Sequence, residues 1–296
     1  MCGRDWSSDV CSSDLGIGME DSQITKDNEN VEKTALIFKI VESLNKILRE
    51  DQMQKQPLFL SINEQFLLKL VTGIVKNPQK SYVIGITGES ASGKTTLVNN
   101  AAKALQKDNK ENLFTTVSCD HYYYDASEEL KRAGSYENLF MTGFSFDTPE
   151  AINLPLMKAH LTSLKCGCSI KCPQYNYVTC ESVPDKEEKN PALIILNEGL
   201  FVLNPDVMDV DDIKVYVFAP FSVIRERWYA RAATRGKTGN AADLQFENVN
   251  QAAQVYIRPT MQHADIVING LTTAEYIEEV IEKIIHTIND ILHLNK

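Results

Sequence analysis

Apolar residues recur along the chain in two alternating patterns, one typical of buried strands and one with the spacing of helices. Short apolar runs typical of strands in a parallel sheet are "SYVIGIT" (81–87), "LFTTVSC" (113–119), "ALIILNE" (192–198), "IKVYVFA" (213–219) and "ADIVING" (264–270). Segments with helical spacing come between or after them, at 94–107, 148–165, 222–234 and 273–292. This alternation predicts an α/β fold, in which helices cover both faces of a central parallel sheet.

Two further segments with helical spacing precede the first of these strands, from Val31 to Glu50 and from Asn63 to Lys76. We interpret residues 31–79 as an N-terminal helical appendage that packs on a domain formed by residues 80–296. Residues 1–30 are polar and predicted to be disordered. Within them, residues 1–18 are rich in Ser and Asp, and they resemble translated adapter or vector sequence more than native protein.

Two local signals refine the middle of the chain. Thr148 and Pro149 suit the cap and the first position of the helix predicted over 148–165. The segment "SIKCPQYNYVTCES" (169–182) is typical of a hairpin-like excursion from the main sheet.

Composition narrows the function classes. The chain has 296 residues and a formal net charge of -10, which argues against a surface for nucleic acid or anionic membranes. No run approaches the roughly 20 apolar residues of a membrane span, and no secretion signal is evident, so we interpret the protein as cytoplasmic. Its seven cysteines lack paired C-x-x-C spacing, which favours free thiols over a zinc site at Cys166–Cys180.

A glycine-rich loop joins the strand at 81–87 to the helix at 94–107. The sequence "GESASGKT" (88–95) fits the phosphate-binding pattern G-x-x-x-x-G-K-[ST], whose backbone N–H groups wrap a polyphosphate at a helix N-terminus. Lys94 would reach the β- and γ-phosphates, and the Thr95 hydroxyl would bind Mg²⁺. The candidate nucleotide-binding residues are Gly88, Glu89, Ser90, Ala91, Ser92, Gly93, Lys94, Thr95 and Thr96.

Two acids follow predicted strands, where parallel α/β sheets bind their ligands. Asp120 comes after "TTVSC" and Glu198 ends "ALIILNE". Either acid could be an ordinary cap or turn residue. A phosphotransferase, however, needs one carboxylate to deprotonate the attacking hydroxyl and one near the metal, and these roles suit Asp120 and Glu198 respectively.

A basic cluster lies within and just after the helix predicted at 222–234. Arg227, Arg231 and Arg235 are four residues apart, which aligns them on one helix face, and Lys237 follows. No acid interrupts that face, so the arginines would repel one another unless they share an anion. A lid that closes over a transferring phosphoryl group is the natural use of such a face.

In order along residues 80–292, the phosphate loop, "CDHYYYD", "FSFDTPEAI", "PQYNYVTCES", "IILNEGLFVL", "ARAATRGKTG" and "IRPTMQHADIVING" resemble the uridine kinase and phosphoribulokinase family. They are most similar to its uridine–cytidine kinase branch. The resemblance implies a three-layer P-loop kinase fold with a small β-hairpin at the acceptor site and a helical lid. It also implies phosphorylation of a nucleoside, uridine or cytidine, in pyrimidine salvage, with Mg²⁺ and with ATP, or alternatively GTP, as donor.

The resemblance also assigns roles to individual residues. Asp120 would be the catalytic base, assisted by Lys94 and by the lid residues Arg231 and Arg235. Metal would be held by Thr95, Asp120 and Glu198. The acceptor site would be formed by Asp147, which holds the ribose hydroxyls, by Tyr175 beside the base, and by Cys180, Arg227, Lys237 and Gln245.

Some features keep alternatives open. Uridine–cytidine kinases carry a base-reading histidine where this chain has Cys180, and a thiol is a poor substitute for an imidazole. A helical segment before the phosphate loop resembles bacterial pantothenate kinase. A phosphoribulokinase would need a basic residue near Asp147 or Tyr175, and none is evident.

Other classes remain as well. A switch GTPase would need an N-K-x-D guanine reader, which "YVFAPFS" (216–222) does not offer. A nucleotide-binding regulatory protein on a kinase fold would bind nucleotide without an acceptor. The partner expected is a small nucleoside-like molecule, with a homo-oligomer as a further expectation.

Overall fold

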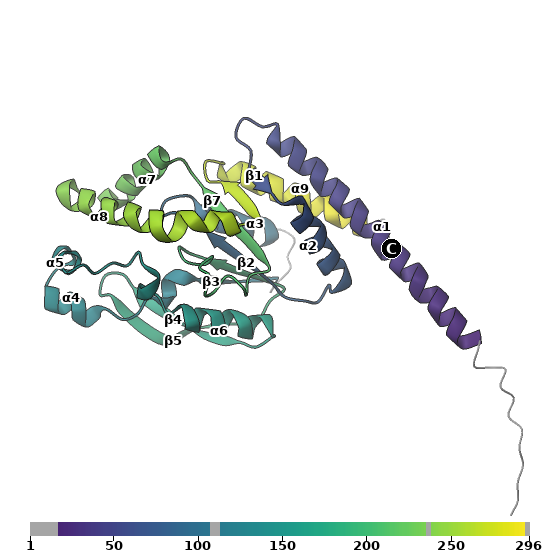
Figure 1. Cartoon of the computed structure of the whole chain (residues 1–296), viewed down its shortest axis with the longest axis horizontal. Coiled ribbons are helices and arrows are strands. Elements are labelled where there is room, and N and C mark those ends of the chain that lie inside the picture. Colours follow the sequence, from purple (N-terminus) through teal and green to yellow (C-terminus); the bar gives the residue numbers. More distant parts are fainter. Residues whose placement is uncertain (1–16, 107–112, 235–237, 294–296) are drawn as a thin grey trace, which may run out of the picture.

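The computed structural model describes residues 17–106, 113–234 and 238–293, and a twisted sheet lies at its centre (Figure 1). Within these ranges the sheet has six strands, in the order β1-β8-β7-β2-β6-β3. All neighbouring strands are parallel except β1, which pairs antiparallel with β8 at one edge. The strands are β1 (Phe59–Ile62), β2 (Tyr82–Thr87), β3 (Phe114–Ser118), β6 (Ile194–Glu198), β7 (Ile213–Phe218) and β8 (Ile266–Asn269). The predicted α/β fold with a central parallel sheet is confirmed.

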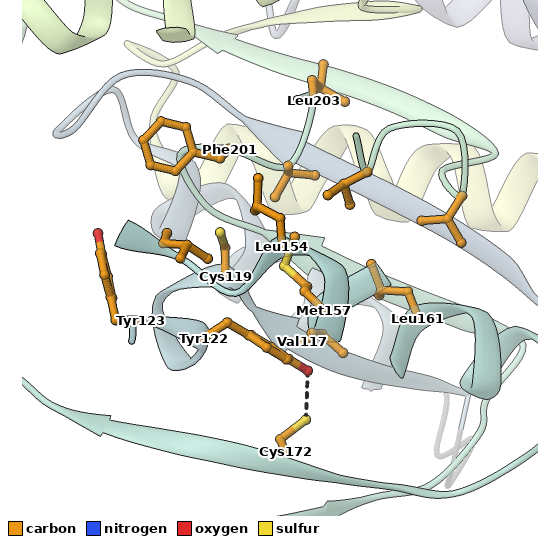
Figure 2. Packing of buried hydrophobic residues seen from close by; sticks show 14 of the residues in the cluster. Val117, Cys119, Tyr122, Tyr123, Leu154, Met157, Leu161, Cys172, Phe201 and Leu203 are labelled. Carbon is orange, nitrogen blue, oxygen red and sulfur yellow. Dashed lines mark hydrogen bonds between the residues drawn. The ribbon is translucent and has the colours of Figure 1, made fainter. Parts of the chain in front are cut away.

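Helices cover both faces of the sheet, because alternate residues of each strand point to opposite sides. On one side, Ile86, Leu196 and Val217 pack in a cluster with α3 (Lys94–Gln106) and α9 (Ala274–His293). On the other side, the strand residues Val83, Ile195 and Tyr216 join a cluster with α6 (Leu154–Lys165). Figure 2 shows part of this second cluster, in which the Tyr122 hydroxyl lies 3.2 Å from the Cys172 sulfur. The result is a three-layer domain.

The N-terminal segment is joined to the sheet. Helix α1 (Ile17–Gln52) packs on α2 (Glu64–Lys76) and α9, and strand β1 between them pairs with β8. The buried carboxylate of Asp51 accepts hydrogen bonds from the backbone N–H groups of Leu58 (2.9 Å) and Phe59 (2.8 Å), which fixes the turn into β1. The sheet therefore crosses the boundary that the sequence predicted at residues 79 and 80, and residues 17–30, predicted to be disordered, lie in α1. Residues 1–16 lie outside the described part of the chain.

The helix predicted over 148–165 is divided in two. A short 3₁₀ turn (Pro149–Ala151) is followed by extended Ile152, and α6 begins only at Leu154. The side chain of Asn153 accepts a hydrogen bond from the N–H of Leu156 (3.1 Å), and Pro155 lies in the first turn. This second start signal outweighs the first, because an asparagine cap and an early proline fix where a helix can begin.

A hairpin and two pairs of helices lie outside the central sheet, around one end of it. The predicted hairpin consists of β4 (Ile170–Asn176) and β5 (Glu181–Lys189), and α4 (Ser127–Ala133) and α5 (Tyr136–Met141) lie close to it. Helices α7 (Phe221–Thr234) and α8 (Gly239–Ala252) lie across from α4 and α5 (Figure 1). A π-helical segment (Ala253–Ile257) and a 3₁₀ turn (Arg258–His263) lead back to β8. Among the described helices, none is long and apolar enough to cross a membrane.

Candidate active site

The glycine-rich loop lies between β2 and the N-terminus of α3, as its sequence predicts. The Lys94 side chain is buried, and its Nζ donates to the backbone carbonyls of Gly88 (2.8 Å) and Glu89 (3.0 Å). Burial lowers the pKa of Lys94, while the nearby charges of Glu198 and Asp120 oppose this effect. The lysine therefore lies between the loop and the two acids, where a phosphate chain would find its counter-charge.

Two glycines let the backbone pass close to the loop. Gly88 has a φ of +151°, and a Cβ atom there would lie 2.4 Å from the carbonyl oxygen of Val217. A Cβ at Gly270, after β8, would lie 1.9 Å from the carbonyl oxygen of Ser92. Side chains at these positions would push the loop away from β7 and β8, so the loop depends on glycine at both.

The two acids lie side by side at the carboxyl ends of neighbouring strands. Ser118 of β3 pairs in register with Glu198 of β6, and its hydroxyl donates to Glu198 Oε1 (2.9 Å). Asp120 follows Ser118 by two residues, in a short 3₁₀ turn (Cys119–Tyr122). Burial and then the charge of Asp120 raise the pKa of Glu198. Paired carboxylates of this kind are stabilised by a cation between them.

The lid arginines reach the loop from α7. Arg227 donates from Nη1 to the carbonyl oxygens of Gly270 (2.9 Å) and Ser92 (3.5 Å), and Arg231 donates to the Ser90 hydroxyl. The shared helix face predicted for these two arginines is therefore what brings both to the loop. Arg227 lies against the backbone of Ser92 in the loop and of Gly270 after β8, and its role in substrate binding stays a prediction. Arg235 and Lys237 lie outside the described residues.

A third arginine at the loop was not found by sequence reasoning. Arg258 forms a two-pronged ion pair with Glu89, with both N–O distances at 2.9 Å, and also donates to Asn250 Oδ1 (2.6 Å). The sequence did contain one signal for such a partner: Glu89 is an acid within a phosphate-binding loop, and such an acid needs a positive counter-charge. Its partner is 169 residues away in sequence, so the pattern could not identify it.

Aromatic rings cluster where the acceptor site was predicted. The Tyr123 ring lies 5.1 Å from that of Tyr175, 5.7 Å from that of Phe146 and 6.2 Å from that of Tyr177, measured between centroids. Burial, followed by the charges of Asp120 and Asp147, raises the pKa of Tyr123. Tyr175 therefore packs against a ring, Tyr123, that lies close to Asp120 and Asp147, while its role beside the base stays a prediction. Three rings of this cluster, Tyr123, Phe146 and Tyr177, were not proposed as site residues.

The remaining acceptor-site candidates differ in exposure. Cys180 is fully buried, and its sulfur lies 3.1 Å from the Tyr136 hydroxyl. That hydroxyl also donates to the backbone carbonyl of Tyr177, so Tyr136 and the turn of the hairpin enclose the thiol. Gln245 is half-buried on α8.

No cluster of three or more His, Cys, Asp and Glu side chains able to hold a metal occurs in the described ranges. The cysteines described, Cys119, Cys166, Cys168, Cys172 and Cys180, are free thiols. Two carboxylates and a hydroxyl still suit Mg²⁺, which is usually bound by one or two carboxylates together with substrate phosphates.

A family model described as "Phosphoribulokinase / Uridine kinase family" matches residues 83–276, which include the loop, both acids and the lid. The chain belongs to this family. It is a phosphotransferase that acts on hydroxyl groups, as the members of the family named uridine kinase are. The predicted family and enzyme class are confirmed.

Individual relatives agree with this membership. The chain is 31% identical to the uridine kinase of Shewanella frigidimarina over 195 residues, which span 65% of this chain and 89% of that protein. It is 33% identical to the uridine kinase of Saccharomyces cerevisiae, with 64% of this chain and 37% of that protein covered. A crystal structure provisionally assigned as a fructose transport system kinase from Silicibacter sp. TM1040 shares the fold, with a TM-score of 0.51, 18% identity, and coverage of 67% of this chain and 97% of that chain.

Proposed function

We propose that this kinase transfers the γ-phosphoryl group of ATP to the 5′-hydroxyl of uridine or cytidine, which is a salvage reaction for pyrimidine nucleosides. The observation that carries the proposal is the placement of Asp120 between the loop and the ring-lined acceptor side. Its charge acts on Lys94 and Glu198 on one side and on Tyr123 on the other. A hydroxyl bound among those rings would lie between a base and the phosphate site.

The residues divide the work as follows. Asp120 accepts the proton of the acceptor hydroxyl and orients it. Lys94 and Arg231 face the phosphate site and stabilise the negative charge that develops there. When bound, ATP with Mg²⁺ supplies the phosphoryl group and further charge neutralisation.

Thr95, Asp120 and Glu198 are the side chains that would hold the metal. Their donor set consists only of hard oxygen ligands, and burial followed by the charge of Asp120 raises the pKa of Glu198, so the ionised pair of acids would be stabilised by added positive charge. A divalent cation would supply that charge. The residues present therefore fit Mg²⁺.

The rings favour a nucleoside over the other acceptors of related kinases. Tyr123, Phe146, Tyr175 and Tyr177 form a cluster of rings, and we propose that the base meets ring faces at the edge of this cluster, near Asp147, which would bind the ribose hydroxyls. A planar base can stack on such faces, whereas pantothenate and ribulose-5-phosphate have no ring to stack. The uridine kinases among the relatives support the same acceptor. Because Cys180 is enclosed, we propose that the rings rather than the thiol recognise the base.

An acceptor panel tests the proposal. ADP release with ATP and Mg²⁺ is measured with uridine, cytidine, pantothenate and ribulose-5-phosphate, and turnover is expected with the two nucleosides. In Asp120→Asn, turnover should fall by about 10²–10⁴-fold while ATP binding is kept. Turnover with pantothenate alone would exclude the nucleoside proposal, and no turnover with any acceptor would favour a regulatory nucleotide-binding protein. Full activity of Asp120→Asn would refute the assignment of the base.

A further inference from the structure

The ion pair between Arg258 and Glu89 links three parts of the molecule. Arg258 begins the 3₁₀ turn after the lid, and Glu89 is the second residue of the phosphate loop. Nε and Nη2 of Arg258 donate to the two carboxylate oxygens of Glu89, each at 2.9 Å, and Nη2 also donates to Asn250 Oδ1 at 2.6 Å. One planar guanidinium therefore contacts the loop through Nε and Nη2, and the same Nη2 also contacts helix α8.

The Glu89 carboxylate belongs to the loop that would bind a polyphosphate. Its side chain is only 12% exposed, and its own backbone carbonyl receives a hydrogen bond from Lys94. A buried negative charge at this place would repel a polyphosphate unless a positive charge compensates it. Arg258 supplies that charge, so the intact pair favours the binding of phosphate at the loop.

The other end of the link is on helix α8, which we count with α7 as the lid. Asn250 lies in the last turn of α8, and a π-helical segment (Ala253–Ile257) separates this helix from Arg258. Helix α8 packs mainly on α7 and on that segment, around an apolar cluster of its own that includes Trp228 and Phe246. Since this cluster is separate from the core of the sheet, the lid can change position without breaking the core.

We propose that Arg258 is a positioning residue that couples nucleotide occupancy of the phosphate loop to the position of the lid helix α8, through Glu89 and Asn250. Phosphate bound to the loop fixes the backbone at Glu89, Glu89 fixes the guanidinium, and the guanidinium holds the end of α8. This inference depends on nucleotide binding at the loop and not on which alcohol is phosphorylated. It can therefore fail or hold independently of the nucleoside proposal.

Hydrogen–deuterium exchange tests the coupling directly. Mg²⁺ with a non-hydrolysable ATP analogue should slow exchange of the α8 amides (Gly239–Ala252) in the unaltered protein. Asn250→Ala should bind the analogue within about twofold of the unaltered protein, yet lose at least half of the protection in α8. Asn248→Ala removes an exposed side-chain amide on the same helix. It is the matched control and should keep the protection in α8. Full protection in Asn250→Ala would overturn the proposal.

A second set of variants separates charge compensation from coupling. Arg258→Ala should weaken binding of the analogue about tenfold, because Glu89 is left without its counter-charge. Adding Glu89→Ala should restore binding to within about twofold, but not the protection of α8. If the double variant regains both, the pair only neutralises itself and the coupling is refuted.

A variant that misfolds would lose both binding and protection for an unrelated reason, so folding is checked first. Thermal unfolding of each variant shows whether it folds. If Arg258→Ala does not fold, Arg258→Lys keeps the charge without the two-pronged geometry. It should bind the analogue within about twofold and lose at least half of the protection in α8. Protection kept in Arg258→Lys, or binding unaffected in a folded Arg258→Ala, would count against the proposal.

Discussion

The proposed phosphate side and the proposed acceptor side of the site are built in different ways. On the phosphate side, one continuous loop supplies most of the groups, and the neighbouring strands leave it no alternative path, as the close approach of Gly88 to Val217 shows. On the acceptor side, single rings come from separate segments: Tyr123 after β3, Phe146 after α5, and Tyr175 and Tyr177 from the hairpin. If the proposed roles hold, the difference means that the backbone fixes phosphate binding, while side chains from separate segments decide the acceptor.

The largest effect is expected on the phosphate side. Lys94→Ala removes the buried ammonium from the loop, so kcat/KM should fall by about 10²–10³-fold with every accepted alcohol. Steady-state ADP release measures this. Lys103→Ala changes an exposed lysine on the same helix. It is the control, and its kcat/KM should be close to that of the unaltered protein. A loss confined to one acceptor would break the distinction between the two sides.

Glycine substitutions compare the backbones of the two sides. Gly88→Ala should lower the free energy of unfolding by about 2–4 kcal/mol, because its Cβ would lie 2.4 Å from a carbonyl oxygen at a positive φ. Gly143→Ala, in the segment before Phe146, also has a positive φ but no atom within 4 Å, and should cost about 1–2 kcal/mol. Denaturant unfolding measures both, and equal costs would contradict the comparison.

A ring substitution should affect the acceptor alone. Phe146→Ala removes a ring that contacts Tyr123 and Tyr175, so KM for the nucleoside should rise about tenfold while KM for ATP is unchanged. Cys180→Ala is the control, because the enclosed thiol should change the nucleoside KM by less than about threefold. A large effect of Cys180→Ala with a small effect of Phe146→Ala would show that the thiol reads the base after all.

The most gradual effect, spread over several pH units, concerns an acid beneath the phosphate side. Burial raises the pKa of Asp211 to about 8, and its Oδ2 would lie 2.2 Å from a Cβ at Gly85 in β2. Between the ordinary pKa of 3.8 and about 8, the folded protein keeps a proton that the unfolded chain releases. Stability should therefore fall as the pH rises through this window, by on the order of 1 kcal/mol per pH unit from this group.

Urea unfolding between pH 5 and 8 checks this dependence, and Asp211→Asn should flatten it. The neighbouring acid, Asp212, has a pKa that is shifted in the opposite direction. Burial opposes the charge of Asp212, but hydrogen bonds from Lys165, the Val83 N–H and Lys80 prevail, and its pKa is lowered. Asp212→Asn removes this stabilised negative charge and should therefore destabilise the protein at neutral pH. An unaltered slope in Asp211→Asn would mean that another group titrates.

Much of the fold followed from local pattern. The strands of the parallel sheet and helices α3, α7 and α9 lie within a residue or two of their predicted bounds, because apolar runs and glycine signals are local. Strand β1 and helix α8 were not predicted. Strand β1 has only four residues and depends on pairing with β8, and α8 is weakly apolar and packs mainly on another part of the lid.

By itself, the sequence determined the phosphate side: a loop in which Lys94 and its glycines lie in one short stretch, and two acids that must lie together because parallel strands end at the same edge. Only the tertiary structure decided which distant groups complete it. Arg258 reaches Glu89 across 169 residues, and Tyr136 encloses Cys180 across 44. Such pairings depend on how the lid and the hairpin pack on the sheet, and packing over long chain separations leaves no period in the sequence.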